Sequence, residues 1–163
     1  MGTLYQYFPH REALLYRILL DHFDAMATAF ERLGARSRAD GEARADAIAV
    51  AIADAYVDEK LTNQLLTRAL YRAADLIDQV TIPPAVFERM GAGIAAALRS
   101  VSDIEIADPH ECAATLLPAL AGLARNAFAL AQEGVGEVDA DSLRRRSRAL
   151  AAAWIAASGS QVR

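Results

Sequence analysis

Apolar side chains recur about every 3.6 residues along almost the whole of this 163-residue chain, which is the spacing of one face of an α-helix. Patterns typical of β-strands are almost absent. The best of them, at residues 101–106, is short and is interrupted by Ser102, Asp103 and Glu105. Hydrophobic residues make up 54% of the chain and charged residues 23%, which is the composition of a globular protein. We therefore predict an all-α fold.

Helix boundaries follow from this periodicity and from residues that cap or break helices. The first long helix is expected to begin after Pro9 and to stop at Gly34. Gly91 and Gly93 either weaken a later helix or allow another backbone to approach it closely. The predicted helices span approximately residues 10–33, 42–58, 60–79, 84–100, 109–133 and 140–157.

The clearest helix start is the run Asp-Pro-His-Glu at 108–111. Its aspartate is suited to the N-cap, its proline to the first helical position and its glutamate to the third, as in a capping box. Asp40 is a plausible cap for the helix at 42–58, and Asp139 or Asp141 is expected to cap the last helix.

Charge and hydropathy exclude several classes of protein. The net charge of −4 argues against a globally basic nucleic-acid binder. No stretch reaches the roughly 18 uncharged apolar residues of a membrane span, because the most apolar segment, 112–131, is interrupted by Pro118, Arg125 and Asn126. The first residues lack the pattern of a secretion signal, so we expect a cytoplasmic protein with no membrane partner.

Signatures of enzymes are missing from the sequence. The histidines His10, His22 and His110 do not have the spacing of a metal-binding helix, and no glycine-rich phosphate loop or nucleophile elbow occurs. The single cysteine, Cys112, excludes an internal disulfide and is expected to act as a small buried hydrophobe. We predict no catalytic residue, no metal site and no cofactor.

The basic residues are almost all arginines. Lys60 is the only lysine, and we interpret this bias as a property of composition without functional meaning. The arginines at 144, 145, 146 and 148 lie within helical reach of Asp139 and Asp141. They are therefore interpreted as a solvated, internally paired face in preference to a nucleic-acid patch.

The strongest local signal is at residues 2–15, which read Gly-Thr-Leu-Tyr-Gln-Tyr-Phe-Pro-His-Arg-Glu-Ala-Leu-Leu. This string resembles the end of the recognition helix, the turn and the start of the fourth helix in the tetracycline-repressor (TetR) family of transcriptional regulators. His10 departs from the family pattern, which usually has serine or asparagine there. The layout of the remaining chain, with a long connecting helix, a variable bundle and two closing helices, is also similar to that family.

The resemblance implies a helix-turn-helix function in DNA binding. Hydroxyls and a guanidinium suit phosphate oxygens, and Gln6 suits an adenine edge. The residues expected to contact DNA are Thr3, Tyr5, Gln6, Tyr7 and Arg11. The alternative is that residues 2–8 only pack against the long helix.

The sequence begins inside the recognition helix of that family, so we interpret residues 1–9 as a remnant of the DNA-binding domain. The resemblance implies two further helices before this point, and we expect them to be missing from the chain as written; a fragment, a misassigned start and a genuine deletion would each explain this. We expect the chain as written to dimerise without binding operator DNA usefully, because the recognition helix needs the preceding helix to hold it in the groove. The full-length form would bind operator DNA.

The resemblance also implies that residues 10–163 form an effector-binding and dimerisation domain. Pockets for small molecules are mostly apolar with a few fixed polar groups. Arg125 and Asn126 stand out because they interrupt an apolar helix, although a bond across a dimer interface or an internal ion pair would also explain them. The expected effector pocket consists of Phe30, Tyr56, Leu66, Arg68, Tyr71, Phe87, Met90, Ile94, Arg125, Asn126 and Phe128.

The predicted helix at 109–133 is apolar on two sides, so both sides must be covered. The helix is either buried inside one chain or packed on one side against a second copy. We favour a two-fold, four-helix interface between two copies. Its expected residues are Leu116, Leu120, Leu123, Ala127, Leu130, Leu143, Leu150 and Trp154. A structural or adaptor-type dimer without an effector, and a small helical enzyme, are the alternative functions.

Overall fold

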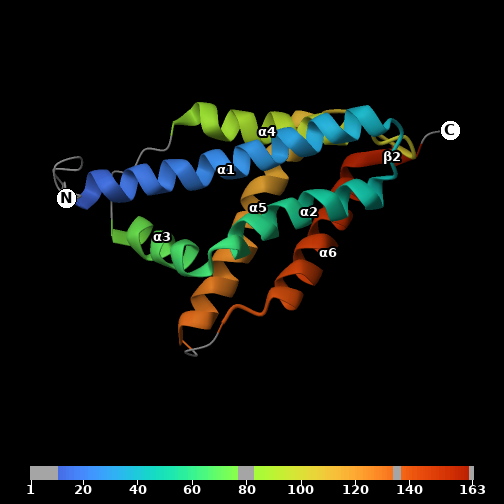
Figure 1. Ribbon diagram of the computed structural model, residues 1–163. Coiled ribbons are helices and arrows are strands. Elements are labelled where there is room, and N and C mark those ends of the chain that lie inside the picture. Colours follow the sequence, from blue (N-terminus) through green and yellow to red (C-terminus); the bar gives the residue numbers. More distant parts are fainter. Residues whose placement is uncertain (1–10, 77–82, 134–136, 162–163) are drawn as a thin grey trace.

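The computed structural model describes residues 11–76, 83–133 and 137–161, and these residues form an all-α fold, as predicted. Figure 1 shows the helices crossing one another at several angles. The elements, in chain order, are α1 (Arg11–Asp40), α2 (Ala45–Thr62), α3 (Gln64–Leu76), α4 (Pro84–Leu98), β1 (Ile104–Ile106), α5 (Pro109–Glu133), α6 (Ala140–Ser158) and β2 (Gly159–Gln161).

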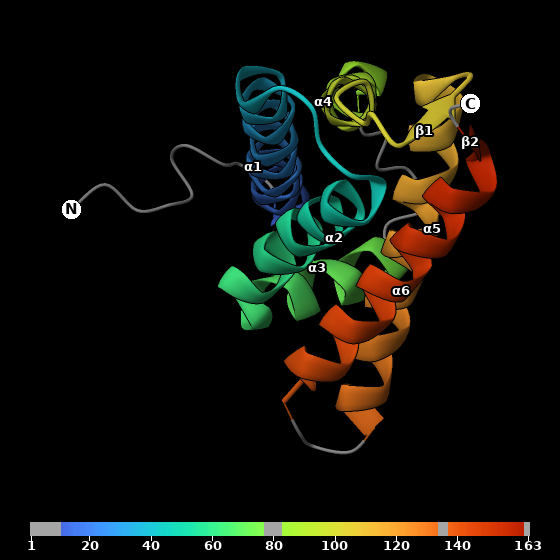
Figure 2. The same ribbon diagram turned by 90° about the vertical axis from the view of Figure 1, so that its right-hand side faces the viewer.

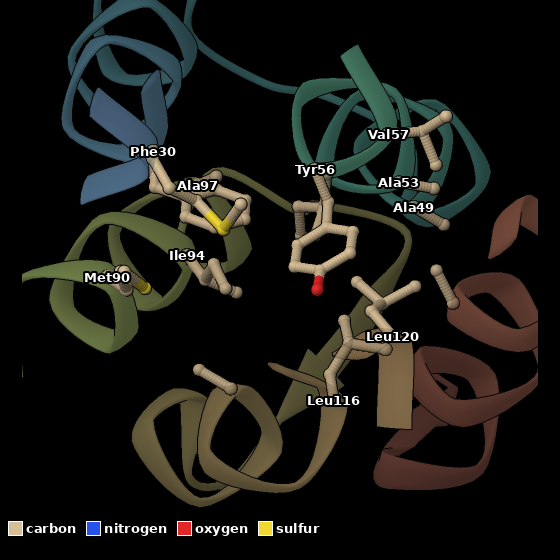
Figure 3. Close-up of a cluster of buried hydrophobic side chains, with 14 of the residues drawn as sticks. Phe30, Ala49, Ala53, Tyr56, Val57, Met90, Ile94, Ala97, Leu116 and Leu120 are labelled. Atoms are coloured by element: carbon tan, nitrogen blue, oxygen red, sulfur yellow. The ribbon is translucent and has the colours of Figure 1, made fainter. Parts of the chain in front are cut away.

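Helix α2 lies at the centre of the bundle. It packs against α1 on one side and α6 on the other, and it also contacts α3, α4 and α5. Helix α4 lies along α1, and α5 lies beside α6 (Figures 1 and 2). Figure 3 shows the core between these helices, where the ring of Tyr56 points from α2 towards Leu116 and Leu120 of α5. These three residues are all 2% exposed or less.

The predicted stop of the first long helix at Gly34 is wrong, because α1 continues to Asp40. Gly34 instead faces α4, where a Cβ added to it would lie 2.6 Å from the carbonyl oxygen of Gly93. The chain turns at Gly41, whose φ of +83° suits glycine. Of the two glycines in α4, Gly93 permits the backbone of α1 to approach closely, whereas Gly91 faces open space.

The predicted cap of α2 is also wrong. Asp40 is the last residue of α1, and the Ala45 backbone N–H at the start of α2 donates instead to Asp103 Oδ1, at 2.8 Å. Asp103 is 58 residues away in sequence, so no local pattern could have indicated this bond. The end of α2 lies later than predicted, at Thr62, which places Lys60 within α2.

Helix α3 begins after Asn63, whose side-chain Oδ1 accepts from the Leu66 backbone N–H at 2.9 Å. This is the bond of an N-cap residue. The predicted end of this helix, at 77–79, lies outside the described residues, as does the start of the break at 81–82. Helix α4 begins at Pro84, as predicted.

The predicted starts of the last two helices are confirmed. Asp108 Oδ1 accepts from the backbone N–H groups of His110 and Glu111, at 2.9 and 3.0 Å. Asp139, and not Asp141, caps α6, because its Oδ1 accepts from the Ser142 N–H at 2.9 Å. Both caps use residues that are neighbours in sequence.

The weak strand signal at 101–106 corresponds to β1, which pairs antiparallel with β2. We did not predict β2. It follows α6 directly, and a Cβ on its Gly159 would lie 2.6 Å from Ile104 Cδ1. This small sheet pairs residues 159–161, which follow α6, with the connection between α4 and α5.

Helix α6 is held against α2 by ion pairs. Arg148 donates through two nitrogens to the carboxylate of Asp54, at 2.7 and 2.8 Å, and Arg144 pairs with Asp54 and Asp58. The interpretation of the arginine cluster as internally paired is therefore confirmed for Arg144 and Arg148. Their partners lie on α2 and not at Asp139 and Asp141.

Helix α5 also packs on α6. Trp154 Nε1 donates to the backbone oxygen of Cys112 at 3.1 Å, and Cys112 itself is buried, as predicted.

Within the described residues, one segment, Pro109–Ala131 of α5, is long and apolar enough to cross a membrane by length and composition alone. Only 28% of its most apolar window is buried inside the structure. Core helices of soluble proteins also meet this criterion.

Candidate functional site

The most unusual group among the described residues is a buried lysine. Lys60, the only lysine of the chain, lies in the last turn of α2 and is 5% exposed. Its Nζ lies 3.0 Å from Nε2 of His22, which α1 contributes. No carboxylate of a described residue forms an ion pair with it. Fully buried lysines are rare because the ammonium loses its hydration.

Three aromatic rings surround the ammonium of Lys60. The distances from Nζ to the ring centroids are 5.7 Å for Phe23, 5.5 Å for Tyr56 and 5.3 Å for Tyr71. All three are within the range of a cation–π interaction. Phe23, Tyr56 and Tyr71 come from α1, α2 and α3, so we call this group, together with His22, the Lys60 cage.

Helical spacing explains how α2 contributes to the cage. The buried residues of α2 recur at three- and four-residue intervals along one face, and Lys60 follows Tyr56 by four residues on that face. Lys60 therefore occupies a position that the helix would otherwise give to a core residue. The rings replace part of the hydration that the ammonium loses there.

Burial changes the acid–base chemistry of the cage. It lowers the pKa of Lys60 to about 8, because the charged form is poorly solvated. Burial also lowers the pKa of His22 to about 4, with a further contribution from the positive charge of Lys60. At neutral pH His22 is therefore uncharged, and its Nε2 accepts a hydrogen bond from the Lys60 ammonium.

The two tyrosines of the cage are held in their neutral forms. Burial raises the pKa of Tyr56 well above its usual value, and burial also raises the pKa of Tyr71. The hydroxyl oxygen of Tyr71 is shielded from solvent. Its interaction with the hydroxyl of Tyr56 raises the pKa of Tyr56 and opposes the rise in the pKa of Tyr71, but the two groups do not reach the geometry of a full hydrogen bond. Such a group would gain free energy from a hydrogen-bonding ligand.

A groove of about 350 Å³ lies between α1, α2 and α3 and reaches the cage at His22. It combines apolar walls with hydroxyl, amide and carboxylate groups, as small-molecule sites do. Thr67, one of its residues, also donates from Oγ1 to the backbone oxygen of Lys60 at 2.9 Å. The lining residues are Ile18, Asp21, His22, Ala25, Glu59, Thr62, Asn63, Leu66 and Thr67.

The chain matches no known protein family, no curated protein and no solved structure. Among the described residues, His, Cys, Asp and Glu side chains form no group of three or more that could hold a metal ion.

The structure brings some of the predicted pocket residues together. Tyr56 and Tyr71 belong to the Lys60 cage, and Leu66 lines the groove. Phe128 of α5 packs against the cage, with its ring centroid 5.7 Å from that of Tyr71. Phe87 of α4 contacts the cage from the outside, since its centroid lies 5.6 Å from that of Phe23, although it is 43% exposed.

Other predicted pocket residues lie elsewhere. Phe30, Met90 and Ile94 are core residues, fully buried between α1, α4 and their neighbours (Figure 3), and they do not line the groove. Arg125 and Asn126 are exposed on α5, so they do not interrupt a buried face of that helix as the prediction assumed. Burial raises the pKa of Tyr71, and the hydroxyl of Tyr56 and then the positive charge of Arg125 act against that rise. Arg68 is half-buried on α3.

The predicted DNA contacts are not described by the structure. Thr3, Tyr5, Gln6 and Tyr7 precede the described residues, and so does the predicted short helix at 2–8. Arg11 is the first residue of α1, but its side chain is also outside the described part.

Part of the predicted dimer interface is corrected by the structure. Leu116, Leu120 and Leu143 are 1% exposed or less within a single chain, so a second copy cannot contact them. Leu116 and Leu120 lie on the buried stripe of α5, which faces α2, α4 and α6, and Leu143 is a buried residue of α6. The remaining predicted residues keep some exposed surface: Leu123, Ala127, Leu130, Leu150 and Trp154.

Sequence reasoning missed the residues at the centre of the site, namely Lys60, His22 and Phe23. One signal for Lys60 was present: it continues the buried stripe of α2 at four-residue spacing after Tyr56. The contribution of His22 and Phe23 depends on how α1 crosses α2, and no local pattern encodes that crossing.

Proposed function

We propose that this chain is the sensing and dimerising body of a TetR-like transcriptional regulator, of the repressor type, that binds a small-molecule effector. The observation that carries the proposal is the string at 2–15, which resembles the end of the recognition helix of that family. It leads directly into the 30-residue helix α1. A long helix is what the resemblance requires at this point of the chain.

The Lys60 cage and its groove support an effector-binding role. They combine a buried cation, a shielded tyrosine hydroxyl and a cavity bordered by three helices. α1 contributes His22 and Phe23, and it is also the helix that follows the DNA-binding string. An effector that moved α1 relative to α2 would therefore change the position of any DNA-binding head attached to its start.

The outer surface of α5 supports a homodimer. This helix is apolar enough to pass as a membrane span, yet only 28% of its apolar window is buried in the single chain. Leu130 is 57% exposed there, and Leu123 and Ala127 are partly exposed. An extended apolar surface on a helix usually marks a contact with another protein. A second copy of the same α5 would cover this surface by two-fold symmetry.

The test of this proposal combines ligand screening with DNA binding. Small lipophilic compounds and small acids are screened for an increase in the melting temperature of the purified chain. If the gene region upstream of codon 1 encodes two further helices in frame, the extended protein should shift DNA from its own promoter. A stabilising compound should then weaken that shift. If no compound stabilises the chain and the extended protein binds no DNA, the proposal fails in favour of a structural dimer.

A further inference from the structure

We propose that Lys60 is a covalent capture site for small, uncharged, apolar aldehydes, with which its amine condenses reversibly to an imine. This inference rests on the proposed effector site at the Lys60 cage, but it requires neither DNA binding nor dimerisation. It arises from three features found together: a buried amine without a carboxylate partner among the described residues, a neutral imidazole 3.0 Å away, and a surrounding aromatic wall.

The first requirement is a neutral amine, because an ammonium has no lone pair with which to attack a carbonyl carbon. With a pKa of about 8, Lys60 is neutral in about a tenth of the molecules at pH 7. For an ordinary lysine the fraction is less than about one in a thousand. Desolvation of this kind is a known way of activating a lysine for Schiff-base formation.

The second requirement is a path for the protons. The Lys60 nitrogen attacks the carbonyl carbon, forming an N–C bond as the C=O π bond breaks, and one of its protons is transferred to the carbonyl oxygen to give a neutral carbinolamine. The C–O bond of the carbinolamine then breaks, and its hydroxyl leaves as water with the second proton from the nitrogen, which leaves the C=N bond. His22 Nε2, at 3.0 Å from Nζ, is positioned to accept the proton of the nitrogen. Amine and aldehyde give imine and water, so no oxidant or reductant takes part.

The third requirement is an environment that favours loss of water. The rings of Phe23, Tyr56 and Tyr71 surround Nζ and exclude solvent, which protects an imine from hydrolysis. The shielded hydroxyl of Tyr71 lies in the same wall and could donate to the carbinolamine oxygen. His22 contacts Nζ and also lines the groove, so an aldehyde is expected to approach the amine from that side.

The groove also restricts the class of carbonyl compound. Two of its lining residues carry carboxylates. Asp21 is paired with Arg17 at 3.0 Å, so Glu59 is the group that opposes an anionic ligand such as a 2-oxo acid. The aromatic wall stabilises an apolar group next to the carbonyl. A small aromatic aldehyde meets both conditions, and benzaldehyde is the simplest probe.

The sequence makes a direct test possible, because Lys60 is the only side-chain amine. The full chain is incubated at pH 7 with benzaldehyde and cyanoborohydride, which traps an imine as a stable secondary amine. Intact mass and peptide mapping then locate the label at Lys60 or at the α-amino group. The variant Arg145→Lys places a reference amine at a position that is exposed on α6. We expect Lys60 to be labelled at least about 10-fold faster than this reference, given its larger neutral fraction.

Two further variants separate chemistry from folding. Lys60→Arg keeps a cation in the cage but removes the nucleophile, so side-chain labelling should disappear. His22→Gln keeps a hydrogen-bond acceptor beside Nζ but cannot take up the proton, so labelling of Lys60 should slow. Pyruvate in place of benzaldehyde should leave Lys60 unlabelled. If either variant does not fold, the ratio between Lys60 and the amine introduced at 145 still decides the question.

The inference is overturned if Lys60 is labelled no faster than the amine at 145, or if pyruvate labels it as well as benzaldehyde does. Benzyl alcohol, which cannot form an imine, distinguishes this failure from failure of the proposed function. Stabilisation of the chain by benzyl alcohol without labelling by benzaldehyde would leave the effector site intact and remove only the covalent step.

Discussion

Gly34 of α1 and Gly93 of α4 lie directly against each other, so that a Cβ on Gly34 would be 2.6 Å from the Gly93 carbonyl oxygen. A Cβ on Gly93 would in turn lie 2.6 Å from the carbonyl carbon of Phe30. The absence of side chains at both positions lets the two helix backbones approach closely. The same pair of helices brings Phe23 of α1 against Phe87 of α4 beside the Lys60 cage.

The first prediction concerns this contact. Gly93→Ala should destabilise the protein by about 2–3 kcal/mol, because the added methyl group meets backbone atoms that cannot move without separating α1 from α4. Gly91→Ala is the matched control, since a Cβ there meets nothing within 4 Å. It should instead stabilise α4 by up to about 1 kcal/mol. Urea unfolding of both variants measures the difference, and equal effects of the two would contradict the glycine contact.

The second prediction concerns the cost of burying Lys60. Its pKa is about 8 in the folded chain and close to 10.5 when exposed, so below pH 8 the folded state carries the cost of a poorly solvated charge. Lys60→Met removes this charge and keeps much of the volume. We expect the variant to be more stable than the natural chain at pH 7, by up to about 3 kcal/mol.

The pH dependence distinguishes this explanation from a simple packing effect. Between pH 8 and 10 the unfolded chain retains the proton that the folded chain has released, so the stability of the natural protein rises with pH. Lys60→Met lacks this contribution. The gap between the two melting temperatures should therefore narrow as the pH rises through that window, and a constant gap would argue against a shifted Lys60.

The third prediction concerns His22 at acidic pH. Its pKa is lowered to about 4, so between pH 6.5 and pH 4 the unfolded state binds a proton that the folded state does not. Stability from this source is complete above pH 6.5 and is lost as the pH falls towards 4, by about 3 kcal/mol in total. In His22→Gln this loss should be absent, so its unfolding midpoint in urea should fall less between pH 7 and pH 4.5. His110→Gln, which replaces an exposed histidine on α5, is the matched control variant.

Features that depend on neighbours in sequence could be predicted. The caps at Asp108 and Asp139 bond to backbone N–H groups two or three residues ahead, and their residue types indicate this. The periodicity of α5 likewise predicted a helix, and the structure shows which stripe is buried. Local chemistry therefore determined the existence of most helices and the starts of the last two.

Features that depend on contacts distant in sequence could not be predicted. Glycine is a residue type that often ends a helix, but the contact of Gly34 with Gly93 keeps it inside α1. Lysine is a residue type that usually lies at the surface, but Lys60 is buried where α1, α2 and α3 cross. In both cases a tertiary contact, and not the neighbouring sequence, determines the structural role of the residue.

The fourth prediction tests one such distant contact. Asp103 accepts from the first backbone N–H of α2, at 2.8 Å from Ala45, so Asp103→Ala should cost about 1 kcal/mol. Asp103 Oδ2 also lies 3.7 Å from a guanidinium nitrogen of Arg44, which is largely exposed. Arg44→Ala removes that ion pair and leaves the cap, so it should cost much less. A similar loss in both variants, measured by thermal unfolding, would mean that the cap is not the main contribution of Asp103.

The last prediction concerns the exposed surface of α5. If a second copy covers it, Leu130→Asp should weaken the dimer, because a buried, unpaired carboxylate at the contact would lose its hydration. Leu65→Asp provides the control: Leu65 is 79% exposed and lies in the first turn of α3, on a different helix. Sedimentation velocity over a range of concentrations should show a dimer for the natural chain and for Leu65→Asp. For Leu130→Asp it should show a dissociation constant at least about 10-fold higher, the change expected for roughly 1.4 kcal/mol. A natural chain that sediments as a monomer at every concentration would remove the two-fold α5 contact, and with it one support for the TetR-like proposal.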